Sequence, residues 1–165
     1  MTLLVAVGTF IHGFDALVEA ADTAAKALDL RGFAQIGGSR AIPRHLDWAR
    51  FLPPTALQAR IAAASLVVCH GGVGLLGEAM RAGRPILVVP RRGRVTRANP
   101  SNDQTALVHR LAEYQPIRVC EHPEELGFHL AAMLAEGLEA RRYYLGSDVP
   151  DLIRSFLQRR PIRSS

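Results

Sequence analysis

The densest group of residues able to bind a ligand runs from His70 to Glu78 and reads His-Gly-Gly-Val-Gly-Leu-Leu-Gly-Glu. It follows Ser65–Cys69, an apolar run typical of a buried strand, and it opens a helical pattern over Val73–Ala82. Glycines at a helix N-terminus let an anion approach the backbone N–H groups, and the helix dipole favours its negative charge. The run therefore predicts a phosphate site, with Glu78 about two helical turns further on and suited to holding a ribose diol.

Two known nucleotide motifs do not fit this spacing. The ATPase loop G-x-x-x-x-G-K-[ST] is absent, and the dinucleotide fingerprint belongs after the first strand, where Gly8-Thr9 lacks the later glycines. Each residue also has a plain structural interpretation. His70 fits a strand-end histidine bonded to backbone, Glu78 a solvated helix residue, and Gly8-Thr9 a tight turn between a strand and a helix.

Positive charge is concentrated in the second half of the chain, within a net charge of +5. Arg91, Arg92, Arg94 and Arg97 put four cations in one loop, which is either a solvated loop or a contact to a phosphate or a partner. The chain has one Trp and three Tyr, with no aromatics interleaved among the arginines. No nucleic-acid partner is therefore expected.

Neither a metal nor another cofactor is expected from the residue spacing. No histidine shows ligand spacing to Cys, Asp or Glu, and no Asp-x-Asp pair exists. His12, in the turn after the first strand, is interpreted as a surface histidine rather than a base. Cys69 and Cys120 end strands that the strand Ile86–Val89 separates, about 10 Å apart by strand spacing, so both are expected to be free thiols.

Short apolar runs alternate with helical patterns along all 165 residues, a length that suits one domain. This alternation predicts an α/β fold with a doubly wound parallel sheet, as a single domain over 1–165 with a basic tail at about 159–165. Strands are predicted at Leu3–Val7, Phe33–Ile36, Ala49–Leu52, Ser65–Cys69, Ile86–Val89 and Ile117–Cys120. Helices are predicted at Phe14–Leu30, Thr55–Ala64, Val73–Ala82, Ser101–Glu113, Pro123–Glu136 and Asp151–Arg159, with Ser101 as an N-cap.

The first residues do not resemble a targeting signal. No Lys or Arg precedes Lys26, so a signal peptide would lack its basic region, and no apolar run reaches the roughly 20 residues of a membrane span. A cytoplasmic location is expected.

Several motifs together resemble the C-terminal domain of family-28 glycosyltransferases. They are His70-Gly71-Gly72-Val73-Gly74, Glu78-Ala79, Gly83-Arg84-Pro85, Val88-Val89-Pro90-Arg91 and Asn102-Asp103-Gln104. The opening Val5-Ala6-Val7-Gly8-Thr9 with Phe14-Asp15-x-Leu17 resembles the small catalytic subunits of split transferases. Those are the dolichol-pathway N-acetylglucosaminyltransferase subunit and its bacterial exopolysaccharide counterparts. The resemblance runs from about residue 3 to 135.

The resemblance implies a Rossmann-like fold, the single donor-binding lobe of a B-type glycosyltransferase, and a set of site residues. Phe51-Leu52-Pro53 would cover a uracil ring, and Leu75 stands where many relatives carry a Ser or Thr that contacts phosphate. The implied contacts are the donor diphosphate for His70, Gly71, Gly72 and Gly74, the uridine ribose for Glu78, the sugar hydroxyls for Asn102, Asp103 and Gln104, and the donor more generally for Gly8, Thr9 and Arg91.

The function implied is the catalytic, UDP-sugar-binding subunit of a two-component inverting glycosyltransferase. It would act in exopolysaccharide or lipid-linked oligosaccharide biosynthesis, with a lipid-linked sugar as acceptor and a membrane-anchored subunit that binds it. The chain would then be peripheral at the inner face of the membrane. The alternatives are a non-catalytic nucleotide-sugar-binding or scaffold subunit and a sugar-nucleotide epimerase, which needs both lobes in one chain.

Overall fold

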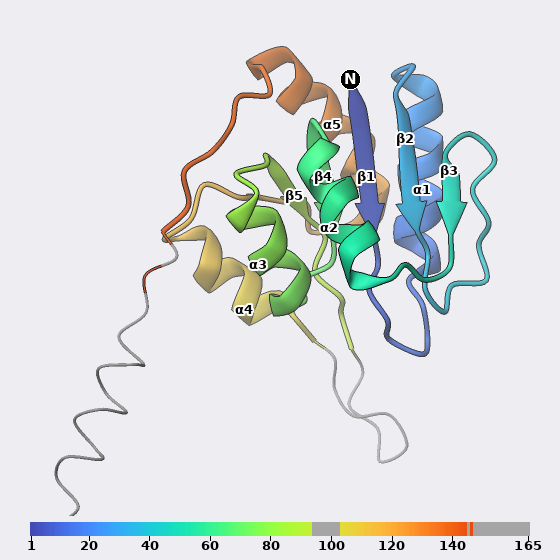
Figure 1. Cartoon of the computed structure of the whole chain (residues 1–165), viewed down its shortest axis with the longest axis horizontal. Coiled ribbons are helices and arrows are strands. Elements are labelled where there is room, and N and C mark those ends of the chain that lie inside the picture. The colour runs from blue at the N-terminus through green and yellow to red at the C-terminus, as the bar shows by residue number, and fades with distance from the viewer. Residues whose placement is uncertain (94–102, 145, 147–165) are drawn as a thin grey trace, which may run out of the picture.

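Six parallel strands form one sheet in the computed structural model, which describes residues 1–93, 103–144 and 146 (Figure 1). The strand order is β3-β2-β1-β4-β5-β6, and each neighbouring pair is parallel. This is the order of a doubly wound sheet, so the predicted fold class is confirmed. The strands are β1 (Thr2–Ala6), β2 (Arg31–Gln35), β3 (Asp47–Ala49), β4 (Leu66–Cys69), β5 (Ile86–Val88) and β6 (Arg118–Val119).

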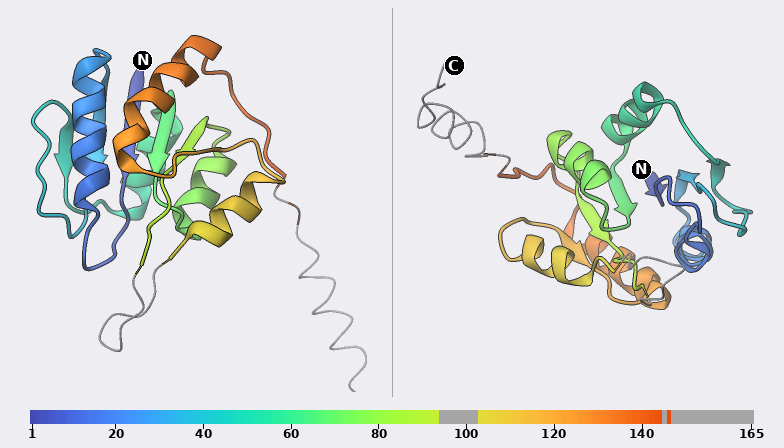
Figure 2. Two further views of the ribbon diagram at one scale, coloured as in Figure 1. Left: turned by 180° about the vertical axis from the view of Figure 1, so that it is seen from behind. Right: turned by 90° about the horizontal axis from the view of Figure 1, so that it is seen from below.

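Helices cover both faces of the sheet. Helices α1 and α5 pack on one face, and α2, α3 and α4 on the other, as Figures 1 and 2 show from opposite sides. Parallel strands need such crossover helices, because the chain that leaves one strand must return to the opposite end of the sheet before the next strand begins. The helices are α1 (Asp15–Ala27), α2 (Pro54–Ala63), α3 (Val73–Arg81), α4 (Thr105–Ala112), the 3-10 helix η1 (Pro123–Glu125) and α5 (Leu126–Glu136).

The two central strands are buried on both faces, which explains their unbroken apolar sequences. In β4, Leu66 and Val68 join the core under α1 and α5, whereas Val67 and Cys69 join the core under α2, α3 and α4. Successive side chains point to opposite faces of a strand, so each run of apolar residues supplies two cores.

Four predicted elements have boundaries that are wrong by two or more residues. The helix expected at Phe14–Leu30 is α1, which ends at Ala27, and the strand expected at Phe33–Ile36 is β2, which begins at Arg31. The strand expected at Ala49–Leu52 is β3, which ends at Ala49 and lies half exposed at the sheet edge, where apolar patterning is weak. The helix expected from Ser101 begins at Thr105, because the two residues before it serve other contacts: Gln104 turns toward the His70 loop and the Asp103 carboxylate caps Thr105.

Three other predictions concern residues that the structure does not describe. They are the cap at Ser101, Arg94 and Arg97 of the arginine-rich loop, and the helix expected at 151–159.

The two cysteines are free and buried, as predicted; Cys69 ends β4, Cys120 directly follows β6, and β5 lies between these two strands. Complete burial raises the pKa of Cys69 to about 12, so its thiol stays protonated. Among the described helices, of which α1 with 13 residues is the longest, none could cross a lipid bilayer.

Candidate functional site

A cleft opens where the strand order reverses, between the carboxyl ends of β1 and β4. Chains leaving neighbouring strands diverge at such a switch point, and ligands of open α/β sheets bind there. This switch-point cleft has a volume of about 670 Å³. It is lined by Gly8, Thr9, Phe10, Ile11, Gln35, Phe51, Leu52, Leu57, His70, Gly72, Val73, Gly74, Leu75, Glu78 and Gln104.

The N-terminus of α3 faces this cleft without a side chain to cap it. The first N–H groups of any helix have no acceptor within the helix, so they can bind an anion. A Cβ added at Gly74 would meet no atom within 4 Å, whereas one at Gly72 would lie 2.2 Å from Cε1 of His70. The backbone at Gly74 is therefore open to a ligand, and the backbone at Gly72 is closely packed against His70.

A buried glutamine holds the loop that leads into α3. The Oε1 atom of Gln104 accepts hydrogen bonds from the backbone N–H of Gly71 at 2.8 Å and of Arg91 at 3.1 Å. Its Nε2 lies 3.0 Å from Nδ1 of His70, closer than the 3.3 Å between that Nδ1 and Oε1. Because Oε1 is engaged by two donors, Nε2 must donate to Nδ1, and neutral His70 then carries its proton on Nε2.

His70 is uncharged at neutral pH. Burial and, to a smaller extent, the nearby positive charge of Arg91 together lower its pKa to about 4, against the opposite effect of the hydrogen bond to Gln104. Its Nε2 faces the loop after β1, where a Cβ added at Gly8 would lie 2.5 Å away. Nε2 is thus closely packed against Gly8, and because His70 also lines the cleft, its N–H is a neutral donor that carries no desolvation cost of a buried charge.

Arg91 is buried and does not line the switch-point cleft. Its guanidinium donates to the backbone oxygen of Val7 at 2.8 Å and to that of Gly13, and it lies 4.7 Å from the ring centroid of Phe14. Arg91 thus ties the loop after β1 to the start of α1. Its charge still acts on the site, since it lowers the pKa of His70.

Gln35, which the sequence analysis did not single out, fixes the other side of the cleft. Its Oε1 accepts from Gly8 N–H at 2.9 Å, and its Nε2 donates to the backbone oxygens of Gly8 at 3.0 Å and Arg50 at 2.8 Å. Gly8 itself has φ of +73°, a conformation that favours glycine. The signal available in the sequence was a single amide inside the apolar run Phe33–Ile36.

The other predicted residues are distributed unevenly around the cleft. Thr9 and Glu78 line it, and Glu78 also pairs with Arg81 at 2.6 Å on the helix surface. Asp103 is exposed and does not line the cleft; its Oδ1 accepts from Thr105 N–H at 2.9 Å. Asn102 lies outside the described residues.

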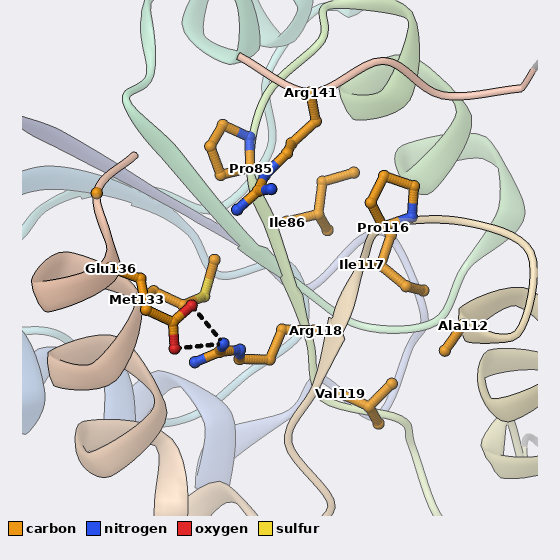
Figure 3. Close-up of a pocket in the computed structure, with 11 residues that line it drawn as sticks. Pro85, Ile86, Ala112, Pro116, Ile117, Arg118, Val119, Met133, Glu136 and Arg141 are labelled. Atoms are coloured by element: carbon orange, nitrogen blue, oxygen red, sulfur yellow. Dashed lines mark hydrogen bonds and ion pairs between the residues drawn. The ribbon is translucent and has the colours of Figure 1, made fainter. Parts of the chain in front are cut away.

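A second pocket, of about 510 Å³, lies at the opposite ends of the strands (Figure 3). It is lined by residues that begin β5 and β6 together with the end of α5, and Arg118 donates to both carboxylate oxygens of Glu136 at 2.7 and 2.6 Å. None of the residues predicted for ligand binding lines this pocket. The switch-point cleft is therefore the candidate functional site.

The fold is that of a doubly wound α/β domain, and sequence comparison gives its family. Residues 2–144 match the glycosyltransferase family 28 C-terminal domain, and the chain belongs to that family. No curated protein matches the sequence.

Solved glycosyltransferases share the fold at low sequence identity. MurG of Acinetobacter baumannii superposes with a TM-score of 0.62 at 22% identity, over 94% of this chain and 50% of MurG. The calicheamicin glycosyltransferase CalG4 gives 0.61 at 19% identity, over 82% of this chain and 35% of its own. The spinosyn forosaminyltransferase SpnP gives 0.59 at 18% identity, over 98% and 40%. The chain thus spans half or less of the length of these enzymes.

Proposed function

We propose that the switch-point cleft binds the UDP-sugar donor of a glycosyl transfer reaction. The observation that carries this proposal is the uncapped N-terminus of α3, open at Gly74 and flanked by the neutral N–H donor of His70, in a family 28 domain. The delocalised negative charge of a diphosphate can be bound by backbone N–H groups together with a neutral donor. The proposal therefore invokes no bound metal for the diphosphate.

The remaining parts of the donor follow from this placement. Glu78 lies on the cleft side of α3 and would accept hydrogen bonds from the ribose hydroxyls. Phe51 and Leu52 line the cleft beside it and offer an apolar cover for uracil. The sugar would extend toward Asp103, while Gln104 and Arg91 would support the diphosphate loop from behind.

Transfer would proceed with inversion. A hydroxyl of the acceptor would attack the anomeric carbon, and the bond to UDP would break through an oxocarbenium-like state. The N-terminus of α3 and His70 would stabilise the charge that develops on the leaving diphosphate. Among the described residues that line the cleft, Glu78 is the one carboxylate, and it is assigned here to the ribose.

The acceptor side would come from a second, membrane-anchored component that binds a lipid-linked sugar. Three apolar side chains around the cleft are largely exposed: Ile11 at 78%, Val73 at 71% and Phe51 at 57%. An exposed apolar rim around a binding site suits a surface that another lobe covers. The split arrangement, the role in exopolysaccharide or lipid-linked oligosaccharide assembly and the peripheral membrane location are proposed together.

A non-catalytic subunit that only binds the nucleotide sugar is the second candidate. The observation that favours it is that Glu78 is the one carboxylate among the described lining residues. A transferase needs a base for the acceptor proton, and Glu78 is already assigned to the ribose.

Glu78→Ala should weaken UDP binding roughly 10- to 150-fold, because a hydrogen bond to a charged group contributes about 1.5–3 kcal/mol. Titration calorimetry of the folded variant measures this loss. Arg81→Ala is the matched control, because it breaks the same surface ion pair but keeps the carboxylate. Unchanged UDP affinity in Glu78→Ala, or an equal loss in both variants, would remove Glu78 from the ribose site.

A further inference from the structure

Three potential metal ligands from three successive elements meet beside the edge strand β6. They are Sγ of Cys120, a carboxylate oxygen of Glu125 and an imidazole nitrogen of His129, and these atoms all lie within 4.8 Å of one another. Cys120 follows β6 directly, Glu125 ends the 3-10 helix η1, and His129 lies in the first turn of α5. The turn from η1 into α5 brings both side chains within 4.8 Å of the same thiol.

We propose that Cys120, Glu125 and His129 bind one divalent cation of the zinc type. A thiolate, an imidazole and a carboxylate form a mixed set that zinc accepts, and the three protein ligands leave a fourth position for water. Neighbouring ligand atoms around tetrahedral zinc are about 3.3–3.6 Å apart, given bonds of about 2.0–2.3 Å. Since all three atoms already lie within 4.8 Å of one another, the largest contraction that the site needs is about 1.5 Å.

The surroundings of the cluster favour a cation. Glu121 and Glu124 lie close enough to act electrostatically on the Cys120 thiol. Glu121 already pairs with Arg92 at 2.7 Å and with His109 at 2.8 Å, so its charge is partly neutralised. The thiol of Cys120 donates to the backbone oxygen of His122 at 3.0 Å. A bound cation would replace that hydrogen bond and release the thiol proton to solvent.

The proposed metal site is separate from the switch-point cleft, since none of its three residues lines that cleft. Cys120 belongs to the core under α1 and α5. Glu125, before α5, is exposed, and His129, in its first turn, is half-buried. A cation here would join the last strand of the sheet to α5. The spacing Cys-x4-Glu-x3-His did not predict this site, because only the return of the chain from β6 into α5 brings the three residues together.

Zinc should bind the chelator-treated chain with a stoichiometry of one and should raise its melting temperature. At a free zinc concentration about a hundredfold above Kd, the expected rise is about 5–10 °C. Competition with a chromogenic chelator measures the affinity. Cobalt in place of zinc should produce the thiolate-to-metal charge-transfer absorption of a cysteine ligand.

Ligand variants and matched controls test the assignment. Cys120→Ser should abolish the cobalt–thiolate band. Glu125→Gln and His129→Gln should each weaken zinc binding at least about tenfold, because even the loss of a residue that only supports a ligand typically lowers metal affinity by that much. The neighbouring Glu124→Gln and His122→Gln should leave the affinity within about twofold. His129→Gln keeps the test valid if Cys120→Ser fails to fold.

The proposal is overturned by any of three results. The first is that zinc binds only weakly and without a defined stoichiometry. The second is an equal loss of zinc affinity in the ligand and control variants. The third is a cobalt–thiolate band that persists in folded Cys120→Ser and so belongs to Cys69.

Discussion

Sugar transfer by this chain should require a membrane component. Purified alone, it should bind UDP and transfer almost no sugar, and adding membranes that contain its acceptor-side partner should restore transfer. Holding two reactants in place lowers a barrier by about 7–11 kcal/mol, and a donor lobe without an acceptor surface loses most of that effect. The measurement is transfer from a panel of UDP-sugars to lipid-extractable product, with membranes heated to destroy protein as the control.

The same experiment separates the competing functions. Membranes should also remove the chain from the soluble fraction, in part through its basic second half, so recruitment should weaken as salt rises beyond about 0.15 M. Robust transfer by the isolated chain would contradict the need for a partner. Recruitment without transfer of any UDP-sugar would favour the non-catalytic candidate.

Gln104→Ala should destabilise the fold and disable the cleft. It leaves the backbone N–H groups of Gly71 and Arg91 without the acceptor that both use, and a buried unsatisfied donor costs about 1–3 kcal/mol. The expected loss in the free energy of unfolding is therefore about 2–6 kcal/mol, measured by urea denaturation. UDP affinity should fall as well, because His70 loses the partner that orients its ring.

Gln115→Ala is the control for Gln104→Ala. Gln115 also exchanges two hydrogen bonds with backbone, at 2.7 and 3.0 Å to Tyr144, but it does so at an exposed position. Water can replace those bonds, so the cost should stay below about 1 kcal/mol. Similar losses in the two variants would contradict the assignment of Gln104 as the residue that holds the His70 loop.

The sheet and the glycine-rich loop were predictable because they depend on local patterns. The unbroken apolar run at β4 and the glycines before α3 follow from burial on both faces and from the approach of backbone to an anion. The edge strand β3 was misplaced by two residues at its start and three at its end, since a half-exposed edge has little apolar pattern to read.

The contacts that shape the cleft were not predictable, because they join residues far apart in sequence. Gln104 matched a motif for sugar contact, yet its side chain is buried against a loop more than thirty residues earlier. Arg91 appeared among loop cations, and the fold buries it beneath Val7 and Gly13. Gln35 carried no motif at all. Long-range hydrogen bonds of this kind depend on the packing of the completed sheet.

The most direct test of the donor site is a UDP titration of Gly74→Ala beside Gly77→Ala. Both replace a glycine in α3, so each should keep the fold or stabilise it by about 0.5–1 kcal/mol. A methyl group at Gly74 meets no protein atom within 4 Å and enters the cleft, whereas one at Gly77 contacts only the end of the Arg81 side chain at 3.4 Å. UDP affinity should therefore fall about tenfold or more in Gly74→Ala, a cost of about 1.4 kcal/mol or greater, and stay within about twofold in Gly77→Ala. Wild-type UDP affinity in Gly74→Ala would contradict a diphosphate bound at the N-terminus of α3.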